Sequence, residues 1–357
     1  MNDSDANNPK GNEIFSGTKE VAENLKFNES DLQEWFGDSI SSAGKILKIA
    51  QFKGGQSNPT YKISTEKQQF VLRRKPPGVL LPSAHAIDRE YKVITALQQS
   101  KVPVPKTYGL CEDEAVIGTA FFVMDFLDGN IYWDLLLDDK SPTARSEIYA
   151  SKNNVIAQLH MVEYESVGLS DYGKPGNYIA RQVSRWTKQY IASETQDIPA
   201  MNKLIDWLPS NIPDEDETSI VHGDYRLDNM VFNANNNVMG VLDWELSTLG
   251  HPIADFNYHC MGWRNIPQLI DEKFCKENGI PTEKEYRDMY SKITDKNLDE
   301  HWEFYTIFNF FKLAGILQGI LGRVRDGTAA SKHAEDRGDQ VIPLAEAAWD
   351  LVEKNYK

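Results

Sequence analysis

The sequence has little cysteine and a shortage of positive charge. Only three cysteines, Cys111, Cys260 and Cys275, occur in 357 residues, and their wide spacing and odd number exclude a disulfide framework or a cysteine-based metal motif. Asp and Glu outnumber Lys and Arg by 53 to 38, which gives a net charge of −15. Such a charge argues against nucleic acid or an anionic membrane as the main partner.

The sequence also lacks an uninterrupted apolar run. Its longest apolar stretch, residues 302–321, contains polar residues that include Glu303 and Lys312, so it predicts a core helix rather than a membrane span. The N-terminus has neither a basic region nor an apolar run, which predicts no signal peptide. We therefore expect a cytoplasmic protein without a membrane partner, and the sequence leaves its oligomeric state open.

The most informative stretch is residues 219–246, in which apolar runs alternate with polar loops. This pattern predicts a strand, a polar loop, a second strand, a tight turn and a third strand. Five polar residues at characteristic spacing lie within it: His222, Asp224, Arg226, Asn229 and Asp243. The first four fit the frame H-x-D-x-[K/R]-x-x-N of a kinase catalytic loop, and the fifth follows Asn229 by 14 residues.

Each of these residue types has a defined task in phosphoryl transfer. The loop Asp accepts the proton of the attacking hydroxyl, while the Asn and the later Asp supply oxygen ligands to Mg²⁺. We therefore predict Asp224 as the catalytic base, Arg226 as a catalytic residue that steadies the transferring phosphoryl group, and Asn229 and Asp243 as metal ligands. The alternative is an ordinary β-hairpin with chance carboxylates, but the complete frame is more specific than its His-Gly-Asp triplet alone.

This frame resembles that of the aminoglycoside phosphotransferase and choline kinase superfamily, whose members are related to the protein kinases. The segment Asp243-Trp244-Glu245 has the Asp-x-Glu form that is usual in small-molecule kinases. The resemblance implies an ATP- and Mg²⁺-dependent phosphotransferase acting on a small-molecule hydroxyl. It also implies an α+β, protein kinase-like two-lobed fold. We expect a disordered tail over residues 1–27, an N-terminal nucleotide-binding lobe over 28–127 with a five-stranded antiparallel sheet plus a helix, and a mainly helical C-terminal lobe over 128–357.

Two strands, predicted over residues 46–52 and 60–64, flank a glycine-rich turn. Such a turn can lay backbone N–H groups over phosphates, and by resemblance Ser57 would contact a phosphate there, although two glycines also fit a plain hairpin turn. On the next strand, period-two alternation puts Val71 and Arg73 on one face. By resemblance Val71 packs on adenine, and Arg73 takes the place of the phosphate-binding Lys with the same charge but a different reach.

A helix predicted from Ser83 to about Ser100 places Glu90 on its apolar face. An unpaired buried carboxylate is costly, so we expect Glu90 to pair with Arg73. The alternative is that Glu90 lies at the edge of the apolar stripe, in water. Elsewhere, Ser30-Asp31-Leu32-Gln33 has the form of a capping box and predicts a helix start, and Ser141-Pro142 predicts another.

The strand that ends at residue 125 leads into the connector between the lobes. By resemblance Met124 is the gatekeeper of the nucleotide site, and the backbone of Asp125 and Leu127 bonds the adenine edge.

A narrower resemblance is carried by residues 70–78, 81–91 and 221–229. These segments are similar to the kinase-like domain of the acyl-CoA dehydrogenase family members 10 and 11, in which it is fused to a dehydrogenase, whereas we expect it to stand alone here. The resemblance favours a hydroxyacyl-CoA as the phosphate acceptor.

Basic residues in the helical lobe bear on the acceptor. Within residues 178–190, three of them share one helical face: Arg181, Arg185 and Lys188. Together with Arg264, Arg323 and Arg325 they would receive an anionic group, although a solvated basic face explains the pattern equally well.

Other functions are considered alongside this one. The acceptor would be a cation in an aminoglycoside- or choline-type kinase, and a degenerate relative would bind nucleotide without catalysis. Silent relatives usually lose the base or a metal ligand, whereas Asp224, Asn229 and Asp243 are all present. A protein kinase is disfavoured because no Ala-Pro-Glu element follows Asp243.

Overall fold

The computed structural model describes residues 17–53, 58–78, 85–214, 216–327 and 338–357. The chain divides into two compact units, and each is discontinuous in sequence. The first unit comprises Met1–Tyr172, His222–Ser247 and Lys276–Ile280, and the second comprises Gly173–Val221, Thr248–Cys275 and Pro281–Lys357. The lobe boundary that the sequence suggests near residue 128 stays a prediction.

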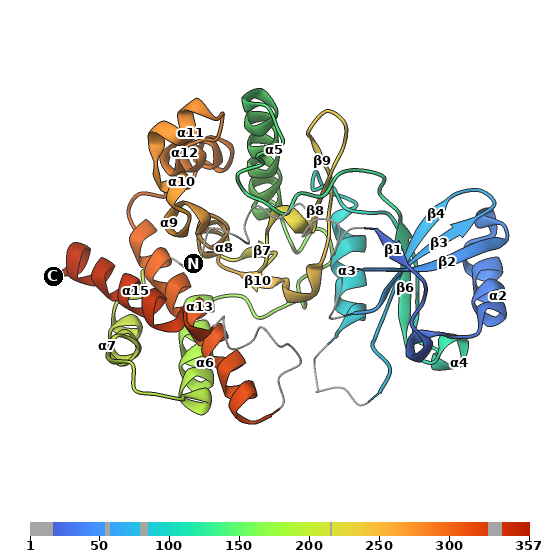
Figure 1. Cartoon of the computed structure of the whole chain (residues 1–357), viewed down its shortest axis with the longest axis horizontal. Coiled ribbons are helices and arrows are strands. Elements are labelled where there is room, and N and C mark those ends of the chain that lie inside the picture. Colours follow the sequence, from blue (N-terminus) through green and yellow to red (C-terminus); the bar gives the residue numbers. More distant parts are fainter. Residues whose placement is uncertain (1–16, 54–57, 79–84, 215, 328–337) are drawn as a thin grey trace. The chain divides into compact units, whose positions relative to one another are not determined.

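The first unit is built on a six-stranded antiparallel sheet with the strand order β1-β2-β3-β4-β6-β5 (Figure 1). Its strands are β1 (Thr18–Lys19), β2 (Ile46–Phe52), β3 (Thr60–Thr65), β4 (Gln69–Arg74), β5 (Thr107–Cys111) and β6 (Phe121–Asp125). Alternation along β4 directs Phe70 and Leu72 into a core with Leu32 and Phe36 of helix α2 (Glu29–Ser39). The other side chains of β4 belong to the opposite face.

The sheet has one more strand than the sequence predicts, and residues 17–27 are not part of a disordered tail. Thr18 pairs with Phe52 at the free edge of β2, and the N–H of Lys53 donates to the carbonyl of Gly17 at 3.1 Å. A short 3-10 turn, η1 (Glu23–Leu25), follows. The two-residue strand has no apolar alternation, so its pairing comes from the unpaired backbone groups of β2.

Helix starts in this unit agree with the sequence in one case and differ in another. Ser141 caps α5 (Pro142–His160) by accepting from the N–H of Ala144, as predicted. The cap of α2 is Asn28 rather than the predicted Ser30, because the Asn28 side chain accepts from the Ser30 N–H. Helix α3 (Ile87–Leu97) follows Ala86 with no side-chain cap, and Ser83, where the sequence predicts the start, lies outside the described residues. Short elements complete this part: η2 (Ser41–Ala43) and α4 (Glu114–Ile117).

The polar loop after residue 221 has the predicted sequence of elements. A 3-10 turn, η4 (Leu227–Asn229), leads into β8 (Met230–Phe232), which forms an antiparallel hairpin with β9 (Val238–Val241). A further 3-10 turn, η5 (Trp244–Leu246), follows Asp243. The strand before the loop, β7 (Ser219–Val221), lies in the second unit, where it pairs with β10 (Thr248–Gly250).

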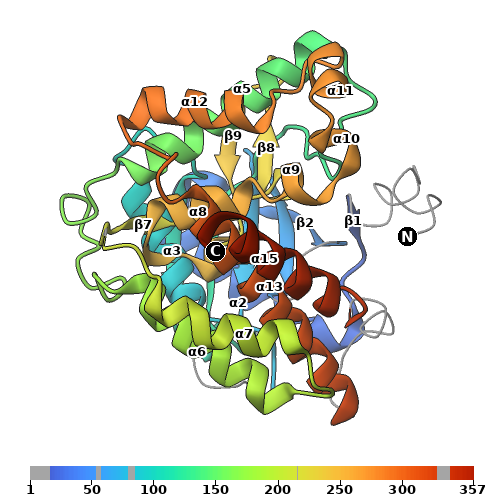
Figure 2. The same cartoon turned by 90° about the vertical axis from the view of Figure 1, so that its left-hand side faces the viewer.

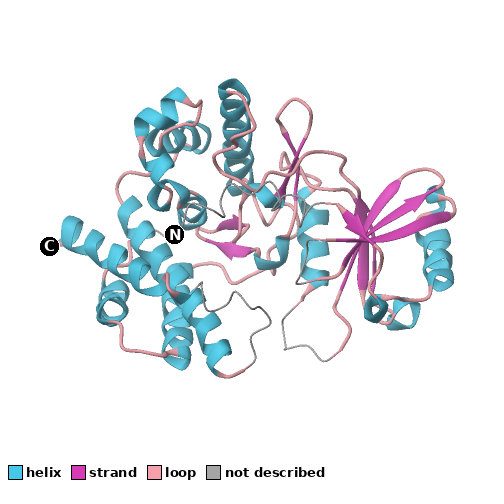
Figure 3. Cartoon of the chain, in the orientation of Figure 1, coloured by secondary structure: helices cyan, strands magenta, loops and turns pink. Residues whose placement is uncertain are grey.

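The second unit is mainly helical (Figures 2 and 3). Its long helices are α6 (Tyr178–Ser193), α7 (Pro199–Trp207), α8 (Pro252–His259), α12 (Glu283–Thr294), α13 (Trp302–Arg325) and α15 (Val341–Tyr356). Shorter ones are η3 (Leu208–Ser210), α9 (Gly262–Asn265) and α10 (Pro267–Ile270), and α11 (Glu272–Glu277) runs across a unit boundary.

Helix α13 is the centre of the second unit. Among the described residues it is the one helix long and apolar enough to cross a membrane, yet 72% of its most apolar 18-residue window is buried inside the protein. It packs against α15, α6 and α8. These contacts make α13 the core helix that the sequence predicts.

Candidate active site

The face of β4 opposite the α2 core carries the residues predicted to contact a nucleotide. Val71 lies directly opposite Met124 of β6, and Arg73 lies opposite Phe122. Cross-strand partners share a face of an antiparallel pair, so Val71, Arg73 and Met124 lie on the same side. The strand register therefore places the residues predicted to contact the nucleotide on one face of the sheet, where Val71 and Met124 are the apolar ones.

The connector after β6 offers the backbone N–H of Leu127 as a donor. The N–H of Asp125 is taken by the carbonyl of Lys106 at 2.8 Å, and its carboxylate accepts from Tyr108 Oη at 2.7 Å. The N–H of Leu127 makes no hydrogen bond to any other described residue. The Leu127 side chain packs on Gly240 of β9 so closely that a Cβ there would lie 2.1 Å from Cδ1. This packing holds the connector against the hairpin and leaves the Leu127 N–H for a ligand.

Arg73 is the charged centre of the site. Its Nε lies 2.7 Å from Glu90 Oε2, and its Nη2 lies 2.6 Å from Asp243 Oδ1 and 3.6 Å from Glu245 Oε2. Arg73 is 7% exposed and Glu90 is 1% exposed. The pairing that the helical periodicity predicts is confirmed, and Glu90 is not at a solvated edge.

The balance of charge around Arg73 is negative, because one guanidinium faces three carboxylates. Burial raises the pKa of Glu90 to about 7. The attraction of Arg73 opposes this shift, while the charges of Asp243 and Glu245 add to it. A partly buried centre with a surplus of negative charge is stabilised by a proton or by a bound cation.

His222 connects the two halves of the catalytic-type loop. Its Nδ1 accepts from the backbone N–H of Asp224 at 3.3 Å, so its Nε2 carries the proton that is donated to the Leu242 carbonyl at 3.0 Å. Gly223 has a φ of +83°, and a Cβ there would lie 2.8 Å from the carbonyl oxygen of Leu246. The loop thus requires glycine at this position, and His222 ties Asp224 to the strand that precedes Asp243.

Asp224 and Asn229 meet within the loop. Asn229 Nδ2 donates to the Asp224 backbone carbonyl at 2.9 Å and to its Oδ2 at 3.2 Å. Burial raises the pKa of Asp224, although the nearby Arg226 and His222 lower it in part. A carboxyl whose pKa is raised toward neutrality is suited to accept a proton.

The oxygens left over by these contacts suit a hard cation. With both hydrogens of Asn229 Nδ2 facing Asp224, its Oδ1 accepts no hydrogen bond from the described residues. Asp243 has a left-handed backbone (φ +62°), and its Oδ2 has no partner among them either. One amide oxygen and one carboxylate oxygen are the ligand types that Mg²⁺ prefers. The donor set therefore fits the metal that the sequence predicts.

Arg226 has a closer partner than the sequence suggests. Its guanidinium binds the Asp228 carboxylate through two nitrogens, with Nε to Oδ1 at 3.0 Å, and lies 3.8 Å from Asp224 Oδ1. The side chain is 58% exposed. The structure thus places Arg226 beside the predicted base but held by Asp228.

Several polar residues of the site are missed by the sequence analysis. Glu245, Asp228, Asn58 and His85 contact site residues or each other. The Asp-x-Glu spacing was a usable signal for Glu245, whereas Asn58 and His85 reach the site only through tertiary contacts. Ser57, predicted to contact a phosphate, lies outside the described residues.

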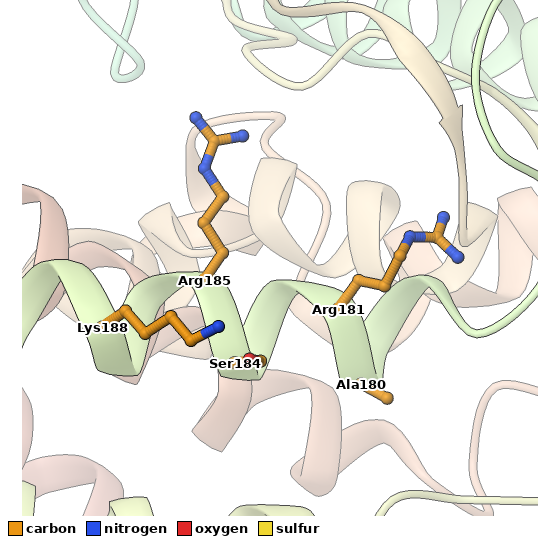
Figure 4. A pocket seen from close by; sticks show the side chains of 5 residues that line it. All are labelled: Ala180, Arg181, Ser184, Arg185 and Lys188. Atoms are coloured by element: carbon orange, nitrogen blue, oxygen red, sulfur yellow. The ribbon is translucent and has the colours of Figure 1, made fainter.

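Fewer basic side chains of α6 are available to a ligand than its sequence suggests (Figure 4). Arg181 donates to the backbone carbonyls of Gly176 and Lys174, so it closes the start of the helix. Arg185 and Lys188 form no hydrogen bond or ion pair with the described residues, and both line an open hollow on the helix surface. This leaves two cations of the predicted three for a ligand.

Two of the other basic residues offered for an anion are already paired. Arg264 bridges Glu283 at 2.9 Å and Glu303 at 2.8 Å. Arg325 binds Asp326 at 2.8 Å and donates to the Glu194 carbonyl at 3.0 Å. These carboxylates already neutralise both guanidiniums in the described structure, and binding of an anionic ligand by Arg264 and Arg325 stays a prediction.

The sheet, the polar loop and the hairpin ending in Asp243 define a protein of the kinase-like fold class, as comparison with known proteins bears out. A model of the phosphotransferase enzyme family matches residues 48–289. The chain belongs to this family.

The chain is also similar to part of two curated relatives. Acyl-CoA dehydrogenase family member 10 of Mus musculus is 45% identical over 86% of this chain and 29% of its own length. Family member 11 of Homo sapiens is 40% identical over 96% of this chain and 45% of its own length. The chain thus spans less than half the length of these relatives.

Solved structures confirm the fold. A Ralstonia eutropha JMP134 protein assigned to the aminoglycoside phosphotransferases is 49% identical, with a TM-score of 0.84 over 92% of this chain and 99% of that one. A thermostable mutant of aminoglycoside phosphotransferase APH(4)-Ia, in a ternary complex with AMP-PNP and hygromycin B, has a TM-score of 0.59 at 12% identity over 92% of this chain and 100% of that one. The second likeness concerns the fold alone.

Proposed function

We propose that the protein transfers the γ-phosphoryl group of ATP to a hydroxyl group of a small molecule, with Mg²⁺ as the metal. The observation that carries this is the convergence in one unit of Asp224 and Asn229 with the Arg73 centre, which includes Glu90 and Asp243. Family membership supports phosphotransfer as the reaction class.

Each residue of the site has a separate role in the proposed phosphoryl transfer. Asp224 accepts the proton of the acceptor hydroxyl while the hydroxyl oxygen forms a bond to the γ-phosphorus. The bond between the γ-phosphorus and the oxygen that bridges it to the β-phosphorus breaks, and ADP leaves. Arg73, held by Glu90, provides positive charge for the phosphates. Asn229 and Asp243 would hold Mg²⁺, which neutralises phosphate charge.

Adenine has a site of matching chemistry on the sheet. Val71 and Met124 provide apolar contact, and the Leu127 N–H is a free donor for a ring nitrogen. The Asp125 carbonyl would accept from the exocyclic amine. Because the Asp125 N–H is already bonded to Lys106, only its carbonyl is assigned to the ligand.

For the acceptor we propose a hydroxyacyl-CoA. Its phosphates suit the exposed cations Arg185 and Lys188 of α6. The names of the two dehydrogenase-family relatives support an acyl-CoA as the compound class. The runner-up is a cationic acceptor of the aminoglycoside or choline type, which the name of the Ralstonia eutropha relative supports. We further propose a cytoplasmic location, supported by three buried, free cysteines.

The experiment is a coupled ADP-release assay with 4-hydroxyacyl-CoA, choline and kanamycin as parallel acceptors. We expect turnover on the thioester that is lost in Asp224→Asn. Turnover on a cationic acceptor alone would replace the acyl-CoA with the runner-up. Tight Mg·ATP binding with no turnover across a broad acceptor set would instead indicate a silent nucleotide-binding module.

A further inference from the structure

Arg73 poses a problem that a lysine at the same position would not. A lysine presents one nitrogen, whereas an arginine presents a fork whose separate nitrogens each need an acceptor. In this chain Nε faces Glu90, and Nη2 faces Asp243 at 2.6 Å and Glu245 at 3.6 Å. The Arg73 side chain is only 9% exposed, so water cannot take over from a lost carboxylate.

Asp243 faces Arg73 through Oδ1, and a metal ion bound at its Oδ2 would share the same carboxylate charge. A cation bound to the Asp243 carboxylate draws its charge away from the guanidinium and repels the guanidinium itself. Nη2 then depends on a second carboxylate within reach. Glu245, two residues further along, is that carboxylate.

Glu245 is held in position by a buried amide. Asn58 Nδ2 donates to Glu245 Oε2 at 3.3 Å, the same oxygen that faces Arg73. Asn58 is fully buried, so its amide has no solvent alternative. Asn58 lies two residues before the start of β3.

The oxygen of the same amide contacts His85. His85 Nδ1 lies 3.0 Å from Asn58 Oδ1, and because an amide oxygen only accepts, Nδ1 carries the proton. A flipped amide would place its oxygen against the Glu245 carboxylate, and two acceptors repel each other. His85 itself has a left-handed backbone (φ +58°), which histidine adopts more readily than most residues.

We infer that Glu245 is a positioning residue of the nucleotide site, the second carboxylate that Arg73 requires because it is an arginine, and that Asn58 and His85 orient it. This inference rests on the proposed function, since it concerns Arg73 with nucleotide and metal bound.

The decisive test is a double-mutant cycle on Mg·ADP affinity, measured by titration calorimetry with Arg73→Lys and Glu245→Gln. In the Arg73 background, Glu245→Gln should weaken Mg·ADP binding about tenfold, as expected for a charged hydrogen-bond partner. In the Arg73→Lys background the same change should cost less than about twofold, because lysine needs one carboxylate. Equal losses in both backgrounds would overturn the inference.

The role of the buried amide is tested by variants of His85. His85→Ala should reproduce most of the Glu245→Gln loss, and His85→Asn should restore binding, because asparagine tolerates a positive φ and supplies an N–H donor. Glu165→Gln, an exposed glutamate of the same unit, is the matched control and should bind like wild type. Equal affinities for His85→Ala and wild type would remove His85 from the assignment.

Failure of the proposed function gives a different result. If the wild type binds no Mg·ADP, the proposed function is wrong, and the same cycle is then measured by urea unfolding in an Asp243→Asn background, where Glu245 is the remaining charged partner of Nη2. Non-additive losses of stability support the Arg73–Glu245 assignment. Additive losses overturn it.

Discussion

Arg73 and Arg185 are both arginines that the sequence suggests for anion binding, yet their surroundings are opposite. Arg73 is buried and faces three carboxylates, whereas Arg185 stands on the surface of α6 with no ion pair among the described residues. A buried charge is stable only with partners, so its position is specified by many contacts. The position of an exposed charge is fixed by no such contacts, so the charge is available to a ligand.

The buried site should respond most strongly to loss of its base. Asp224→Asn is expected to lower turnover by about 10² to 10⁴, the usual contribution of a general base, while ATP affinity stays within a few-fold. Turnover is followed by ADP release and affinity by calorimetry, with the exposed Asp38→Asn as the control. Near-normal turnover would remove Asp224 from the mechanism.

Loss of a metal ligand should have the second largest effect. Asp243→Asn keeps the left-handed backbone accessible but removes the charge, and should weaken Mg²⁺-dependent ATP binding about 100-fold or more, at or beyond the upper range for changes around a metal site. Asn229→Ala should cost about tenfold, because a neutral amide is the weaker ligand for a hard cation. Wild-type affinity in Asp243→Asn would show that the metal assignment is wrong.

The charge surplus around Arg73 gives a pH dependence of stability. The pKa of Glu90 is about 7 in the folded state against an ordinary value of 4.5, so between these values the folded state binds more protons than the unfolded state. The contribution of this group is therefore full below pH 4.5 and is lost as pH rises through about 7.

Glu90→Gln should remove that slope, which is at most about 1.4 kcal/mol per pH unit for one proton. Urea unfolding of wild type and Glu90→Gln across pH 4.5–8, without nucleotide or metal, measures the difference between them. A difference that does not change with pH would mean that Glu90 stays ionised throughout.

Substitution of the exposed Arg185 on α6 should have the smallest effect on activity. Arg185→Ala is expected to raise the KM for a hydroxyacyl-CoA two- to fivefold at unchanged kcat, since an exposed ion pair contributes about 0.2–1 kcal/mol. The KM for the matching pantetheine thioester, which lacks the CoA phosphates, should not move, and Lys354→Ala on α15 serves as the control. An equal rise for both thioesters would assign Arg185 to something other than phosphate binding.

Local patterns predicted much of the fold. The sequence predicted the strands β2, β3, β4 and β6, and the start of α5 followed from Ser141-Pro142, because each depends on residues close in sequence. The cap of α2 was misplaced because Asn28 and Ser30 are both good N-cap residues, and Gln33 instead accepts from the Ile46 N–H at 2.6 Å. The strand β1 was missed because two residues carry no periodic signal.

The sequence by itself determined which residues are equipped for phosphotransfer, since the order and spacing of Asp224, Asn229 and Asp243 follow from one loop and one hairpin. It also determined the Arg73–Glu90 pair, because a carboxylate on an apolar helical face needs a cation. Only the tertiary structure decided the rest of the site. Asn58, His85 and Glu245 meet across up to 187 positions of chain, and hydrogen bonds between such distant residues depend on packing that no local pattern records.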